Sequence, residues 1–119
     1  MSSVYEDYEK VCCVKDVKNL AERLYGCYVI VRTYSSGVHF GVLKEFDSEH
    51  NQALLNNSRR IYSWEKAFTL SQVSQDGVGA DSKLSMEIPV LFFSNVIEII
   101  PCTKKAVENL KGIKTHSPE

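Results

Sequence analysis

Residues 27–46 read CYVIVRTYSSGVHFGVLKEF and decide the fold of this 119-residue chain. Two runs rich in Val, Ile, Tyr and Phe flank a Ser-Ser-Gly break, the pattern of two adjacent antiparallel strands joined by a short turn. Neither face of the first strand is polar before Arg32, so we expect a central strand that is covered on both sides. One face should carry Val29, Val31 and Thr33, and the other Tyr28, Ile30, Arg32 and Tyr34.

The rest of the chain predicts helices at both ends of a β-rich core. Apolar residues recur every three or four positions before Gly26, which indicates an amphipathic helix. Thr69 or Ser71 can cap a short helix near 70–77, and Thr103 can cap a last helix. The apolar run over 90–100 is too long for one average strand and should break at Ser94-Asn95.

We therefore predict one α+β domain, a small twisted, mainly antiparallel sheet or partial barrel of about five strands with N- and C-terminal helices. Residues 1–119 form this single domain. Its parts are an N-terminal helical segment (1–26), a β-rich core (27–101) with the short helix near 70–77, a C-terminal helix (102–112) and a tail (113–119).

The amino-acid composition and net charge argue against some classes of binding partner. The chain is 44% hydrophobic and 24% charged with a formal net charge of −1. A net charge this close to zero produces only a weak electrostatic field, which disfavours a long duplex nucleic acid as partner. No run approaches the roughly 18 apolar residues of a membrane span, so we expect no membrane partner. The start, MSSVYEDYEK, is acidic where a secretory signal is basic and then apolar, which predicts a cytoplasmic protein.

Cysteines and histidines suggest no metal site or cofactor. Cys12, Cys13, Cys27 and Cys102 lack the Cys-x-x-Cys spacing of metal and redox sites, and a reducing cytoplasm favours small buried thiols. The three histidines, at positions 39, 50 and 116, are too scattered for a zinc site. No recognisable nucleophile and base arrangement appears, so we expect a protein that is not an enzyme.

Two polar clusters are candidate ligand-binding sites. The first surrounds the turn of the hairpin and comprises Arg32, Thr33, Tyr34, Ser35, Ser36 and His39. The second lies in NNSRRIYSW and comprises Arg59, Arg60, Tyr62 and Trp64. A guanidinium beside aromatic rings can bind a phosphate and stack a base. In strand geometry Arg60, Tyr62 and Trp64 should point one way, and Arg59, Ile61 and Ser63 the other.

Each cluster also has a structural interpretation. Arg32 has five donors to satisfy, and either an anionic ligand or a carboxylate such as Glu98 would do so. In the second cluster the aromatic rings can be core residues and the arginines solvated edge residues. The sequence leaves both alternatives open.

The order of four motifs resembles a known family. VRTYSSGVHFG, NNSRRIYSW, LSQVSQDGVG and VIEIIPCT, spread over roughly residues 28–110, are similar to small uncharacterised proteins of bacteriophages and prophages that carry a domain of unknown function. The resemblance implies no activity. It implies a small, virus-associated protein in the cytoplasm of a bacterial host.

Origin and chemistry together give a hypothesis. A homo-oligomeric phage protein could act as a sponge, an anti-defence protein that sequesters a nucleotide-derived immune signal of the cyclic oligonucleotide or cyclic ADP-ribose type without cleaving it. The arginines would bind its phosphates and the aromatic side chains would stack its bases. The alternatives are a protein-binding inhibitor of a host defence or metabolic enzyme and an accessory protein that binds single-stranded nucleic acid.

Overall fold

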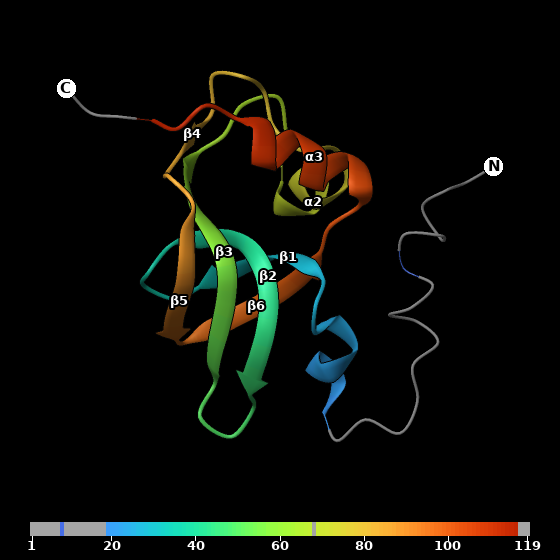
Figure 1. The fold of residues 1–119 in the computed structure, drawn as a ribbon, viewed down its shortest axis with the longest axis vertical. Helices are drawn as coiled ribbons and strands as arrows, with labels where there is room; N and C mark the ends of the chain where they lie inside the picture. Colours follow the sequence, from blue (N-terminus) through green and yellow to red (C-terminus); the bar gives the residue numbers. More distant parts are fainter. Residues whose placement is uncertain (1–7, 9–18, 68, 117–119) are drawn as a thin grey trace.

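The computed structural model describes residues 8, 19–67 and 69–116, in which one antiparallel sheet packs against short helices (Figure 1). This arrangement confirms the predicted α+β class. The strands are β1 (Tyr28–Thr33), β2 (Val38–Asp47), β3 (Gln52–Ser63), β4 (Lys83–Leu84), β5 (Ile88–Ser94) and β6 (Val96–Pro101). The helices are the 3-10 helix η1 (Leu20–Leu24), α2 (Leu70–Asp76) and α3 (Lys104–Gly112).

Most of the expected N-terminal helix, together with Cys12 and Cys13, lies outside the described residues. The described part of that segment, η1, is a 3-10 helix. The predicted caps and the predicted strand break are observed. Thr69 caps α2, Thr103 caps α3, and the apolar run breaks at Asn95 between β5 and β6.

The sheet curls because of the way its strands are connected. β1 lies between β2 and β6, and β3 pairs with β2 on one side and with both β4 and β5 on the other. β5 pairs with β3 and β6 pairs with β1, so the two strands lie on opposite sides of the central strands β3, β2 and β1. Because only Asn95 separates β5 from β6 in the chain, these two sides of the sheet must come together at Asn95. Among the described residues β5 and β6 do not pair, so the curled sheet stays open.

A bulge in β3 makes the bend. Asn57 has a φ of 52°, and the register with β2 shifts between the pairs Phe40–Arg59 and Val42–Asn56. Gly41 faces this bulge, where a Cβ atom would lie 2.9 Å from the Asn56 carbonyl oxygen. Because a bulge increases local twist, one half of β3 can pair with β5 while the other half pairs with β4.

Both faces of the sheet are covered, as the alternation in β1 predicts. Ile30 belongs to the core under α2 and α3, whereas Val29 and Val31 belong to the core enclosed by the curl. The helix-side core consists of Ile30, Phe40, Ile61, Val73, Val78, Leu84, Leu110 and Ile113. The enclosed core consists of Val29, Val31, Leu43, Ala53, Leu55 and Phe93.

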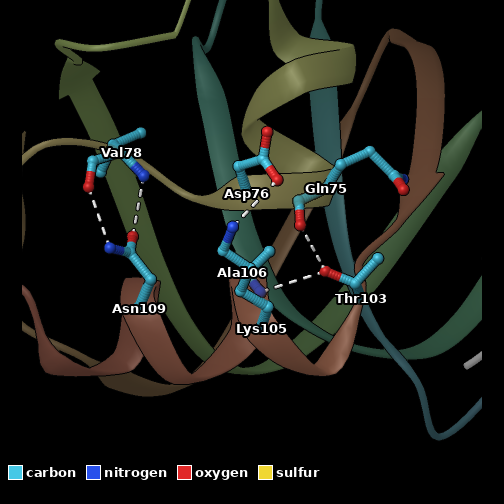
Figure 2. Close-up of polar contacts among 7 residues, drawn as sticks. All are labelled: Gln75, Asp76, Val78, Thr103, Lys105, Ala106 and Asn109. Atoms are coloured by element: carbon cyan, nitrogen blue, oxygen red, sulfur yellow. Dashed lines mark hydrogen bonds and ion pairs between the residues drawn. The ribbon is translucent and has the colours of Figure 1, made fainter. Parts of the chain in front are cut away.

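Hydrogen bonds join α3 to α2 and to the loop that follows α2 (Figure 2). Thr103 Oγ1 accepts from Ala106 N and donates to the Gln75 carbonyl oxygen at 2.6 Å, so one hydroxyl caps α3 and ties it to α2. The Asn109 side chain donates to Val78 O at 2.9 Å and accepts from Val78 N at 2.8 Å. The two helices thus form one layer over the end of the sheet that carries β4 (Figure 1).

No helix within the described residues is long and apolar enough to cross a membrane.

We predict that Gly41→Ala lowers the free energy of unfolding by about 1–3 kcal/mol, because the added methyl group overlaps the bulge opposite. Chemical denaturation measures the loss. The matched control is Gly112→Ala in α3, where a Cβ atom meets nothing within 4 Å. That control should leave the protein equally stable or slightly more stable. Equal stabilities for the two variants would contradict the role of Gly41.

Candidate ligand-binding site

A pocket of about 190 Å³ opens beside the bulge, between β2, β3 and β5. It brings together three residues that the sequence predicts for ligand binding, namely His39, Arg60 and Tyr62. His39 and Arg60 are direct cross-strand partners, so both predicted clusters contribute to one site. The complete lining is His39, Ser58, Arg60, Tyr62, Ser85, Met86, Ile88 and Leu91.

His39 is the most unusual residue of the pocket. Its side chain is buried and its ring stacks on Phe93 with centroids 4.9 Å apart. Neither ring nitrogen makes a hydrogen bond of normal distance and angle to a described protein atom. The backbone of Ser36 is nevertheless close enough to raise the pKa of His39 slightly. Burial, with the positive charge of Arg60 second, lowers the pKa of His39 to about 4. The imidazole is therefore neutral at pH 7.

Ser85 holds Arg60 at the mouth of the pocket. The backbone N–H of Arg60 donates to Ser85 Oγ at 2.8 Å, and the N–H of Ser85 donates to the Arg60 carbonyl oxygen at 2.8 Å. The Arg60 side chain is exposed and forms no ion pair with a described residue. Its position is thus fixed by the backbone while its guanidinium remains available to an anion.

Arg59 lies on the opposite side of β3, away from the pocket. Its Nε donates to the Ser85 carbonyl oxygen at 2.8 Å and its Nη1 to the Leu110 carbonyl oxygen at 2.7 Å. The second bond joins β3 to the C-terminal end of α3, and burial lowers the pKa of Arg59. The structure thus gives this predicted ligand residue a role inside the fold.

Arg32 forms an ion pair with Glu98 across β1 and β6, with 3.6 Å between Nη1 and Oε2. The structural alternative for Arg32 is therefore the one observed. Both side chains are about half exposed, so the pair contributes little stability.

The hydroxyl groups near the turn stabilise the turn itself. Thr33 Oγ1 donates to the Gly37 carbonyl oxygen at 2.8 Å and accepts from the backbone N–H and the hydroxyl of Ser36. Ser35 and Tyr34 are exposed, and none of these four predicted residues lines the pocket.

The prediction that Trp64 points the same way as Arg60 and Tyr62 is wrong. It packs against the helix-side core, whereas Arg60 and Tyr62 line the pocket. The reason is that β3 ends at Ser63, so the period of two no longer applies at Trp64.

Five pocket residues are not among those predicted from the sequence. Four of them, Ser85, Met86, Ile88 and Leu91, come from β5 and the segment before it. No local pattern marks these four, because they reach the pocket only through the pairing of β5 with β3. The fifth, Ser58, stands directly before the two arginines, and its Cα lies 3.1 Å from the place of a Cβ on Gly41. Its only signal in the sequence is the Asn-Asn pair before it, because asparagine tolerates the positive φ that Asn57 adopts.

One group of described side chains could ligate a cation. Asp47, Glu49 and His50 place their ligand atoms within 4.8 Å of one another at the turn after β2. All three are exposed, and His50 Nδ1 lies 2.8 Å from Asp47 Oδ2. This hydrogen bond lowers the pKa of Asp47 and accounts for the geometry without a metal.

A second, mainly apolar hollow of about 280 Å³ lies between η1 and β6. Its described lining includes Asn51 and Glu98 and none of the predicted ligand-binding residues.

Three comparisons relate the chain to known proteins. The profile of a family described as a domain of unknown function, DUF6948, matches residues 26–110. No curated protein matches the sequence significantly.

Among solved structures, a heptameric archaeal Sm protein is 22% identical with a TM-score of 0.45, covering 67% of this chain and 91% of its own. The SmAP1 heptamer of P. aerophilum is 21% identical with a TM-score of 0.47, covering 75% and 96%. A chain of the NatC complex bound to CoA is 16% identical with a TM-score of 0.43, covering 81% and 99%. At these sequence identities and TM-scores, no binding partner or assembly of these proteins is assigned to this chain.

We predict that His39 stays neutral until the pH approaches 4. An unfolded histidine binds a proton near pH 6.5, so the unfolded state takes up a proton between pH 6.5 and 4 that the native state does not. The free energy of unfolding should therefore decrease on acidification through this range, and His39→Leu should show a flatter dependence. Denaturation at several pH values measures it, and the exposed His116→Gln is a control that should keep the wild-type dependence. A wild-type pH dependence equal to that of His39→Leu would contradict the prediction.

Proposed function

This chain belongs to the DUF6948 family, and we propose that it binds a nucleotide-derived anionic small molecule at the His39 pocket and holds it without cleaving it. The single observation that carries the proposal is the buried, neutral imidazole of His39, which has no hydrogen-bond partner among the described residues and lies in a pocket beside an exposed arginine. A buried polar group without a partner costs about 1–3 kcal/mol, and perturbed titratable groups in clefts mark functional sites.

The side chains around the pocket support a ligand of this type. Arg60 can donate paired hydrogen bonds to a phosphate. Tyr62 is 57% exposed at the same place, so its ring is open to a base. Ser58 adds a hydroxyl group at the wall.

The same lining supports binding in preference to catalysis. The described pocket contains no carboxylate and no cysteine that could serve as acid, base or nucleophile. His39 is the one imidazole among the lining residues and their best candidate for a general base. With a pKa of about 4 and both nitrogens covered, it is a poor base.

The resemblance to phage and prophage proteins suggests the biological ligand. In this proposal the protein is phage-encoded and acts in the host cytoplasm. It lowers the free concentration of an immune signal of the cyclic oligonucleotide or cyclic ADP-ribose type. Sequestration of this kind needs affinity and abundance, and it needs no turnover.

Native mass spectrometry with a panel of cyclic dinucleotides, cyclic oligonucleotides and cyclic ADP-ribose isomers tests the proposal. We expect one class to bind and to be recovered intact after heat release. Arg60→Gln should weaken binding at least tenfold while leaving the melting temperature nearly unchanged, because its side chain is exposed.

Three other results would contradict the proposal. A degraded product would make the protein an enzyme. Binding of single strands with a steep salt dependence would favour the nucleic-acid alternative. The absence of any nucleotide complex, with a host protein captured instead, would favour an inhibitor. Arg59→Gln serves as a control because it should lower stability through the lost contacts to Ser85 and Leu110.

A second observation favours self-association. β5 and β6 are outer strands of the sheet, as is the two-residue β4, and β5 and β6 each have one side that pairs with no described strand. Val90 and Phe92 on β5 are 55% and 63% exposed, and Ile97 on β6 is 48% exposed. Open edges with apolar side chains are sites of strand pairing between chains. We infer that copies of the chain associate through these edges.

Light scattering after size-exclusion chromatography tests this inference. The wild-type protein should exceed the 13.5 kDa of one chain, and Phe92→Lys should shift it towards that mass. Lys114→Glu, an exposed position after α3, is the control and should leave the mass unchanged. A monomeric wild-type protein would rule out association through the edges.

A further inference from the structure

The proposed binding function leaves open which part of the ligand enters the pocket. We propose that the pocket receives one uncharged heteroaromatic base, and that a phosphate of the same ligand stays outside against Arg60. This inference rests on the proposed function and adds an orientation and a chemical class to it.

The size of the pocket is the first argument. Pockets that enclose a drug-sized ligand measure roughly 300–1,000 Å³, whereas this one measures about 190 Å³. A whole cyclic dinucleotide therefore cannot enter. Only a fragment of it can, and the choice lies between a base and a phosphate.

The walls are the second argument, because they are mostly apolar. Met86, Ile88 and Leu91 contribute aliphatic surface, and the ring of His39 is supported from behind by Phe93. A phosphate taken into such walls would lose its hydration and gain few donors. A flat ring with polar atoms only at its edge loses much less.

The hydrogen-bonding capacity of the interior is the third argument. Ser85 Oγ already accepts from Arg60 N and donates to the Met86 carbonyl oxygen, so its donor is in use. A neutral imidazole offers one donor and one acceptor. Bases present both kinds of group along their edges, whereas a phosphate presents acceptors only.

Access to the ring nitrogens of His39 requires covering protein atoms to move. Both ring nitrogens are covered by protein atoms. Met86 is 62% exposed at the pocket, and its unbranched side chain adopts many conformations. It is the wall residue best suited to yield to an incoming base.

The position of Arg60 completes the arrangement. Its guanidinium is exposed beside the pocket, so a phosphate that it binds remains partly hydrated and needs no buried counter-charge. The contact to Arg60 should be sensitive to salt, while the contact of the base with the walls should not.

NMR of methyl-labelled protein tests the proposal. The probes are adenosine, guanosine, AMP, GMP, cyclic di-AMP, cyclic di-GMP and inorganic pyrophosphate. A base in the pocket produces ring-current shifts at the methyl groups of Met86, Ile88 and Leu91, which pyrophosphate cannot produce. The methyl groups of Leu20 and Ile97, in the other hollow, are the internal control and should not move.

Two variants separate the base from the phosphate. Arg60→Gln should keep the methyl shifts with a nucleoside and should weaken the matching monophosphate about tenfold, to nearly the affinity of the nucleoside. His39→Phe keeps an aromatic ring over Phe93 but removes both nitrogens. It should weaken nucleoside and monophosphate by the same factor.

The outcomes distinguish this inference from the proposed function. Nucleotide binding that moves the Arg60 signals and leaves the three methyl groups unchanged would overturn the orientation and leave the binding function intact. Methyl shifts caused by pyrophosphate would do the same. If none of the probes binds, and the nucleotide panel also fails, both the orientation and the binding function are wrong.

Discussion

The contact between Gly41 and the bulge at Asn57 is the constraint on which the rest of the structure depends. The Asn56 carbonyl oxygen approaches so closely that a side chain at position 41 would have no room. This approach bends β3, which lets its first half pair with β5 and its second half with β4. The curl encloses one core, the helices cover the other, and the pocket opens beside the bend, between residues of β2, β3 and β5.

The two adjacent arginines show how the fold divides similar side chains between structure and surface. Arg59 points to the helical layer and donates to carbonyl groups on the β4–β5 connection and α3. Arg60, one residue later, faces the pocket with an exposed guanidinium. The pairing of β3 with Ser85 keeps both in place, since Ser85 accepts from Arg59 Nε and exchanges two hydrogen bonds with Arg60. Ser85 therefore positions both Arg59, which packs inside the fold, and Arg60, the candidate binding residue.

His39 connects stability to the proposed function. Its neighbour Phe40 fills the helix-side core, and the period of two turns His39 the other way, against Phe93 and the pocket. An apolar side chain of similar size would pack there without an unsatisfied group. The fold retains an imidazole whose protonation is suppressed by burial and by Arg60. Such a group reduces stability while adding a neutral donor and acceptor to an otherwise apolar cavity.

The sequence alone determined the α+β class, the central hairpin, both faces of β1, the break at Asn95 and the capped helices, because these follow from local periodicity and capping chemistry. It also named His39, Arg60 and Tyr62. Only the tertiary structure decided that these three meet, that Arg59 turns inward, and that Arg32 pairs with Glu98. Those outcomes depend on strand order and on one bulge. Strand pairing between distant segments and a one-residue shift in register leave almost no trace in the local pattern of a sequence.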